Sequence, residues 1–150
     1  MTVSSVELPD DGECAFCAYL RGARPFSIVI RDELTATLVT REQRGIPHLL
    51  VIPVAHRETI LELRDGEAAA LLIAVREAAR AISYAYRRPG IAVWQNNGRP
   101  ANQTVSHVHF HVAGTLDSGG TDWGKVDELP IEATNVIAER IRACLDRRGV

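Results

Sequence analysis

Residues 106–112 read Ser-His-Val-His-Phe-His-Val, and this stretch decides both the fold and the chemistry to expect of the chain. Side chains alternate between the faces of a β-strand, so the spacing places His107, His109 and His111 on one face and the apolar residues between them on the other. Three of the five histidines of the chain fall here. Buried imidazole nitrogens without partners cost about 1–3 kcal/mol each, so this face must meet something polar. We expect a metal ion, a phosphate group or a hydrogen-bond network.

The composition indicates an ordinary globular protein. A chain of 150 residues, 46% hydrophobic and 24% charged, is long enough for one domain with a sizeable core. The net charge of −2 creates no general attraction for nucleic acid or an anionic membrane, so we expect neither as a partner. Residues 1–10 carry no signal-peptide pattern, and no apolar run reaches the length of a membrane span. The cytoplasm is therefore the expected compartment.

Hydrophobic periodicity predicts an α+β fold with a five-stranded, mainly antiparallel sheet, one long central helix and a C-terminal helix. Apolar runs bounded by turn residues predict strands, and apolar residues at helical spacing predict helices. The strands are expected at 26–30, 34–40, 48–53, 91–96 and 105–113, and the helices at 65–86 and 131–145. We expect a single domain over 1–150, with a motif-bearing core at about 14–124 and a helical extension over 125–150.

Residues 14–17 read Cys-Ala-Phe-Cys and form a second candidate site. Three cysteines in the whole chain fit a reducing compartment better than a disulfide framework. On its own, such a pair is a redox couple, half of a zinc site or two buried thiols. A zinc site needs two further nitrogen or sulfur ligands. Cys144, in the expected C-terminal helix, is interpreted as a packing residue.

Two longer patterns surround these residues. Residues 96–105 read Asn-Asn-Gly-Arg-Pro-Ala-Asn-Gln-Thr-Val and lead into the histidine triplet, and residues 45–56 read Gly-Ile-Pro-His-Leu-Leu-Val-Ile-Pro-Val-Ala-His. Together they resemble, in the right order, the signature motifs of the histidine-triad (HIT) superfamily. The resemblance implies the HIT fold and nucleotide binding, usually with hydrolysis or transfer at an α-phosphorus.

The resemblance also implies roles for individual residues. His109 matches the family nucleophile, which attacks phosphorus to give a nucleotidyl-histidine that water or another acceptor resolves. His111 and His48 match positions that hydrogen-bond the phosphate or its bridging oxygen, and Thr104 matches a position that orients the phosphate and leaving group. The implied substrate-binding loop supplies Asn96, Arg99, Asn102 and Gln103.

In the zinc-containing branch of the superfamily, the cysteine pair is completed by two histidines, here His56 and His107. The resemblance therefore implies a zinc site of Cys14, Cys17, His56 and His107. Four protein ligands leave no open position, so the zinc would be structural. Family members of this kind are generally homodimers whose sheets join across the central helix, and a homodimer is expected here.

Three positions depart from the family pattern. The aspartate that binds ribose hydroxyls is replaced by Thr40, the small residue before the glutamine by Asn102, and the Pro-Arg after the triad by residues 113–114, Ala-Gly.

We predict a hydrolase or transferase acting on a nucleoside monophosphate conjugate such as a phosphoramidate. The alternatives are a dinucleoside polyphosphate hydrolase or phosphorylase, a non-catalytic nucleotide-binding module, and an enzyme whose triad binds a catalytic metal.

Overall fold

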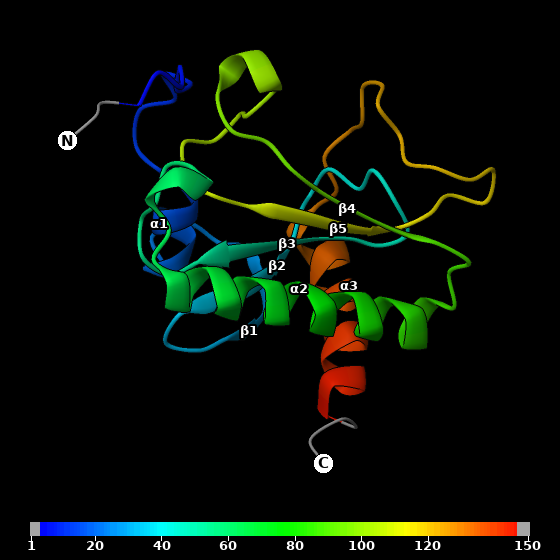
Figure 1. Ribbon diagram of the computed structural model, residues 1–150. Helices are drawn as coiled ribbons and strands as arrows, with labels where there is room; N and C mark the ends of the chain where they lie inside the picture. The colour runs from blue at the N-terminus through cyan, green and yellow to red at the C-terminus, as the bar shows by residue number, and fades with distance from the viewer. Residues whose placement is uncertain (1–3, 147–150) are drawn as a thin grey trace.

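A five-stranded sheet in the order β1-β2-β3-β5-β4 forms the centre of the molecule (Figure 1). The computed structural model describes residues 4–146. All four strand pairings are antiparallel, which confirms the predicted α+β class. The strands are β1 (Ser27–Arg31), β2 (Thr35–Val39), β3 (His48–Pro53), β4 (Ile91–Gln95) and β5 (Phe110–Gly114), with short 3-10 turns at Ile60–Glu62 and Arg99–Ala101.

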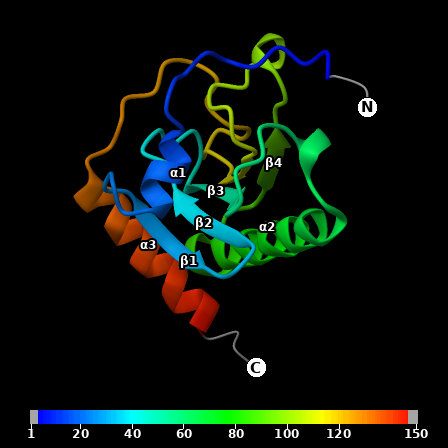
Figure 2. The ribbon, with the colours of Figure 1, turned by 90° about the vertical axis from the view of Figure 1, so that its left-hand side faces the viewer.

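Helices α2 (Asp65–Tyr86) and α3 (Ile131–Asp146) cover one face of the sheet, and α1 (Ala15–Leu20) lies on the other (Figures 1 and 2). On the first face, Leu71 of α2 and Ile141 of α3 are completely buried in one apolar core with Val112 of β5. On the second face, Phe16 of α1 packs against Leu38 and its apolar neighbours on β2 and β3. This division follows from the alternation of side chains along each strand.

The long helix begins and ends where the sequence predicts, at residues 65 and 86. Glu67 accepts the backbone N–H of Arg64 at 2.8 Å and so closes a capping box. The same carboxylate, which is nearly buried, pairs with the Arg57 guanidinium at 3.0 Å. This ion pair ties the start of α2 to the segment that follows β3. None of the described helices is both long enough and apolar enough to cross a bilayer.

The predicted strand over 105–113 is wrong in its first half, because β5 begins only at Phe110. The backbone N–H of His107 donates to the Val105 carbonyl at 2.8 Å, and that of Val108 donates to the Arg57 carbonyl at 2.7 Å. These local bonds replace a strand ladder. His107 therefore lies outside the strand, where its ring faces Phe16 and the two cysteines beside α1.

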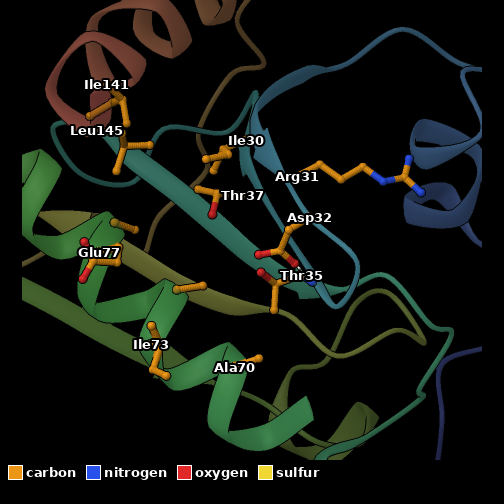
Figure 3. Close-up of a pocket in the computed structure, with 12 residues that line it drawn as sticks. Ile30, Arg31, Asp32, Thr35, Thr37, Ala70, Ile73, Glu77, Ile141 and Leu145 are labelled. Atoms are coloured by element: carbon orange, nitrogen blue, oxygen red, sulfur yellow. Dashed lines mark hydrogen bonds between the residues drawn. The ribbon is translucent and has the colours of Figure 1, made fainter. Parts of the chain in front are cut away.

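The face covered by α2 and α3 contains a hollow of about 380 Å³ beside β1 and β2 (Figure 3). Its walls are mostly apolar, with Ile30 and Ile73 at its sides and Ile141 at its end. The described residues that line it include no histidine or cysteine. The reactive side chains therefore gather on the opposite face of the sheet.

Candidate active site and metal centre

A cleft of about 300 Å³ opens on the face of the sheet that carries α1. All three predicted catalytic histidines and Thr104 line it, together with aromatic and charged side chains from α1 and the segment between β2 and β3. Its lining includes Phe16, Arg44, His48, Thr104, His109 and His111.

The ring of His109 is held in one tautomer. Its Nδ1 lies 2.7 Å from the carbonyl oxygen of His107. A carbonyl only accepts, so Nδ1 carries the proton and, in the neutral ring, Nε2 keeps its lone pair. His109 is 5% exposed, and this burial lowers its pKa, which favours the neutral form. The ring is therefore prepared to act as a nucleophile.

His48 and His111 form a second ordered arrangement. The backbone N–H of Arg44 donates to His48 Nδ1 at 3.1 Å, so the proton of neutral His48 lies on Nε2. His48 Nε2 is 2.9 Å from His111 Nδ1 and therefore donates to it. The proton of His111 is left on its own Nε2. This series of hydrogen bonds, from the Arg44 N–H through His48, thus leaves His111 Nε2–H as a hydrogen-bond donor at the cleft.

The indole of Trp94 fixes the plane of the His111 ring. The two residues are cross-strand partners on β4 and β5, and their rings stack with centroids 4.6 Å apart at an angle of 4°. Phe16 lies edge-on to His109 at 5.1 Å. The sequence motifs identified neither contact, nor the role of Arg44. The only available signals are that Phe16 stands between the paired cysteines and that Arg44 directly precedes the upstream motif.

From the predicted substrate-binding motif at residues 96–105, Thr104 and Val105 line the cleft, and the four side chains expected to bind substrate do not. Gln103 is buried behind it, where Oε1 accepts the Gly98 N–H at 2.6 Å and Nε2 donates to the carbonyls of Glu58 and Val105 at 2.7 and 2.8 Å. Gln103 therefore holds the shape of the loop.

The other three loop candidates do not line the cleft. Asn96 donates from Nδ2 to the Ala101 carbonyl at 2.8 Å, and Asn102 ends the 3-10 turn in a left-handed conformation with φ of 70°. The Arg99 guanidinium lies 3.5 Å from the Glu7 carboxylate and is exposed. These three side chains are therefore not placed to contact a phosphate in the cleft.

The four predicted metal ligands lie together, with ligand atoms all within 4.8 Å of one another. His107 Nδ1 is 3.3 Å from Cys14 Sγ, 3.7 Å from Cys17 Sγ and 3.2 Å from His56 Nδ1, and Cys17 Sγ is 3.4 Å from His56 Nδ1. A tetrahedral zinc site requires about 3.3 Å between two nitrogens and about 3.6 Å between a sulfur and a nitrogen. The spacing of this cluster could hold such an ion.

Two details of the cluster favour a cation. His107 Nε2 donates to the Pro53 carbonyl at 2.8 Å, so Nδ1 presents its lone pair to the cluster, as is usual for a metal-binding histidine. Burial and the neighbouring Cys14 raise the pKa of the Cys17 thiol to about 11. A positive ion between the sulfurs would supply the charge that two adjacent thiolates need.

Comparison with known proteins gives the family. Residues 21–117 match the HIT domain model. The chain belongs to the HIT family. It is 34% identical over 99 residues to the adenosine 5'-monophosphoramidase of Schizosaccharomyces pombe, covering 66% of this chain and 71% of that one. The structure of a HIT-like protein from Bartonella henselae matches with a TM-score of 0.82 at 26% identity, covering 89% of this chain and 97% of that one.

A zinc-bound histidine triad protein from Mycobacterium smegmatis shares the fold, with a TM-score of 0.78 at 24% identity over 90% of this chain and 94% of that one. These matches confirm the predicted HIT fold. In this HIT protein, Thr40, which stands where the resemblance expects a ribose-binding aspartate, also lines the cleft. It lies there beside Arg41, which pairs with Glu128 at 2.9 Å.

The buried histidine pair makes the stability of this HIT protein sensitive to acid. Burial, followed by the charge of Arg44, lowers the pKa of His48 from 6.5 to about 4, and burial with the neighbouring His109 and His48 lowers that of His111 to about 2. Between pH 6.5 and about 4 the unfolded chain therefore binds protons that the folded chain excludes.

We predict that the free energy of unfolding falls as the pH is lowered from 6.5 toward 4, by up to about 1.4 kcal/mol per pH unit for each of these histidines. Urea denaturation at pH 7.5, 6.5 and 5.5 measures it, and His48→Gln should show the shallower dependence. Equal stability at all three pH values would show that the rings are not held neutral in the fold.

Proposed function

We propose that this HIT protein is a nucleotide hydrolase or nucleotidyl transferase that cleaves at the α-phosphorus of a nucleoside monophosphate conjugate, of the phosphoramidate type, through a nucleotidyl-His109 intermediate. The observation that carries the proposal is the neutral ring of His109, held by the His107 carbonyl beside the donor His111. The similarity to an adenosine 5'-monophosphoramidase supports the same class of substrate.

The reaction follows from these tautomers. The lone pair on His109 Nε2 attacks phosphorus in line, the new N–P bond forms, and the bond from phosphorus to the leaving nitrogen breaks. The leaving amine takes its proton from water. His111 Nε2–H donates to a phosphoryl oxygen, where it offsets the charge that develops in the transition state. Water then attacks phosphorus and gives up a proton to the hydroxide left by the first step, the N–P bond breaks, and the electron pair returns to Nε2.

The remainder of the cleft suits a nucleotide. Its apolar end is formed by Phe16, Leu50 and the stacked rings of Tyr19 and Phe26, whose centroids are 4.0 Å apart. A flat base fits such a surface, and the polar and charged groups that line the rest of the cleft then fix its orientation. Thr104 and Thr40 supply hydroxyl groups near the phosphate and sugar positions.

The role of His109 as the nucleophile can be tested by substitution. His109→Asn should reduce release of AMP from adenosine phosphoramidate by at least about 1000-fold, because none of the other described residues that line the cleft offers the same lone pair. Binding of AMP, followed by titration calorimetry, should remain measurable and serves as the control for folding. A dinucleoside polyphosphate is assayed in parallel, and faster turnover of that substrate would favour the alternative hydrolase. AMP release by His109→Asn at the wild-type rate would exclude the mechanism.

We also propose that the metal held by Cys14, Cys17, His56 and His107 is zinc in a structural role. Two thiolates and two imidazoles at tetrahedral spacing are a donor set that zinc prefers. All four positions are occupied by protein ligands, so zinc would clip the segment around α1 to the loop that ends at β5.

Cys14→Ser should lower the zinc content from about one ion per chain to nearly none and lower the Tm by roughly 5–15 °C, because the metal-binding energy contributes to folding. Cys144→Ser, in α3 and outside the cluster, is the matched control and should keep its zinc. Elemental analysis and thermal denaturation measure the two quantities. Unchanged zinc content in Cys14→Ser would contradict the proposed zinc site.

We further propose a homodimer that joins the exposed edge strand β4 and the outer face of α2. Strand β4 is at the end of the sheet, Val93 on it is 49% exposed, and Leu72 of α2 is 66% exposed. Edge strands with apolar side chains invite pairing.

Leu72→Asp should convert a particle of twice the chain mass into one of the single chain mass in light scattering. Val136→Asp, at an exposed valine of α3, should not, and a wild-type monomer would contradict the proposal.

A further inference from the structure

An N-terminal strap, residues 6–11, crosses the outside of the loop formed by residues 98–106, which carries Thr104 (Figures 1 and 2). At one end of the contact, the Glu7 carbonyl accepts the backbone N–H of Arg99 at 2.6 Å. Gly98 has φ of +92°, and a Cβ at that position would lie 2.8 Å from Val6. The strap and the loop are therefore in close contact where the loop begins.

The other end of the strap binds the end of the loop. The backbone N–H of Ser106 donates to Asp11 Oδ2 at 3.1 Å, and the Ser106 hydroxyl donates to the Pro9 carbonyl at 2.9 Å. Ser106 directly precedes His107, and the strap leads within three residues to Cys14, so both segments enter the metal cluster immediately afterwards. Strap and loop are thus joined at both ends.

The loop is also held from inside, by the three hydrogen bonds of the Gln103 amide. Thr104, between these two sets of contacts, is exposed, and its hydroxyl forms no hydrogen bond with any other described residue. Its position in the cleft is therefore set by the backbone of the loop alone. The contacts with the strap hold this backbone from the outside, and those of Gln103 hold it from the inside.

We propose that the strap positions the loop for the reaction, with Asp11 as a positioning residue that acts through Ser106 on Thr104. This inference rests on the proposed function, because it assigns to residues outside the cleft an effect on the chemical step. A hydroxyl displaced by a fraction of an ångström orients the leaving group poorly in the transition state, whereas binding of the nucleotide depends on other parts of the cleft. Loss of the strap contact should therefore lower kcat more than it raises KM.

The test compares four variants at three positions, with kcat and KM for AMP release, zinc content, and hydrogen exchange at residues 103–106 as readouts. Asp11→Ala should lower kcat about fivefold to tenfold, with KM and zinc within about twofold of wild type, and should speed exchange at Ser106. Asp11→Asn keeps a side-chain acceptor and should restore kcat. Asp10→Ala removes the same charge next to it and should behave as wild type.

Ser106→Ala, which removes only the bond to the Pro9 carbonyl, is the fourth variant and should lower kcat about threefold. Faster exchange at Ser106 with unchanged kcat in Asp11→Ala would overturn the inference. So would loss of zinc, which would assign Asp11 to the metal centre, or an equal loss of kcat in Asp10→Ala. If the wild-type chain releases no AMP, the proposed function itself fails and this inference falls with it.

Discussion

The hydrogen bond from His109 Nδ1 to the carbonyl oxygen of His107, 2.7 Å long, is the interaction on which the rest of the site depends. It decides which nitrogen of His109 has a lone pair. The backbone that supplies the carbonyl is itself held, because the His107 side chain is completely buried, donates to Pro53 and faces the cysteine pair. One residue therefore belongs to the candidate metal cluster through its ring and to the candidate active site through its backbone.

The sheet brings the remaining groups to this point. In the antiparallel pairing of β3 with β5, His48 starts one strand and His111 lies two residues from its partner on the other. Side chains that are 63 residues apart in sequence are thereby 2.9 Å apart in space. Strand β4 adds Trp94, whose ring stacks on that of His111 and lies 5.2 Å from that of His48. Because β3 and β5 lie inside the sheet and are paired on both sides, the rings of His48 and His111 have little freedom to leave the arrangement in which Arg44 orients His48 and His48 orients His111.

The parts of the structure that could be predicted from the sequence are those with a local physical cause. Helix α2 has an apolar stripe of helical period and a proline after its end, and its predicted limits are the observed ones. The triplet spacing correctly placed His109 and His111 against each other, at 5.0 Å between ring centroids. The grouping of the four metal ligands came from the resemblance to the HIT family, and their spacing in the structure agrees with it.

What the sequence did not reveal depends on contacts between distant segments. The strand expected from residue 105 is broken because the Arg57 carbonyl, far away in the sequence, takes the N–H of Val108. Arg99 was expected at the phosphate, but the strap holds its backbone and Glu7 faces its side chain. Alternating or periodic patterns contain no information about such pairs. They are set by tertiary packing, which overrides local preference in loops.

The most direct test of the account is to locate the covalent intermediate. The protein is mixed briefly with adenosine phosphoramidate and quenched, and intact-mass and fragment spectra are recorded. We predict a mass gain of one adenylyl group that maps to His109 within residues 105–112. An adduct on another side chain, or on the chain with His109→Asn, would contradict the claim that the lone pair set by the His107 carbonyl attacks phosphorus.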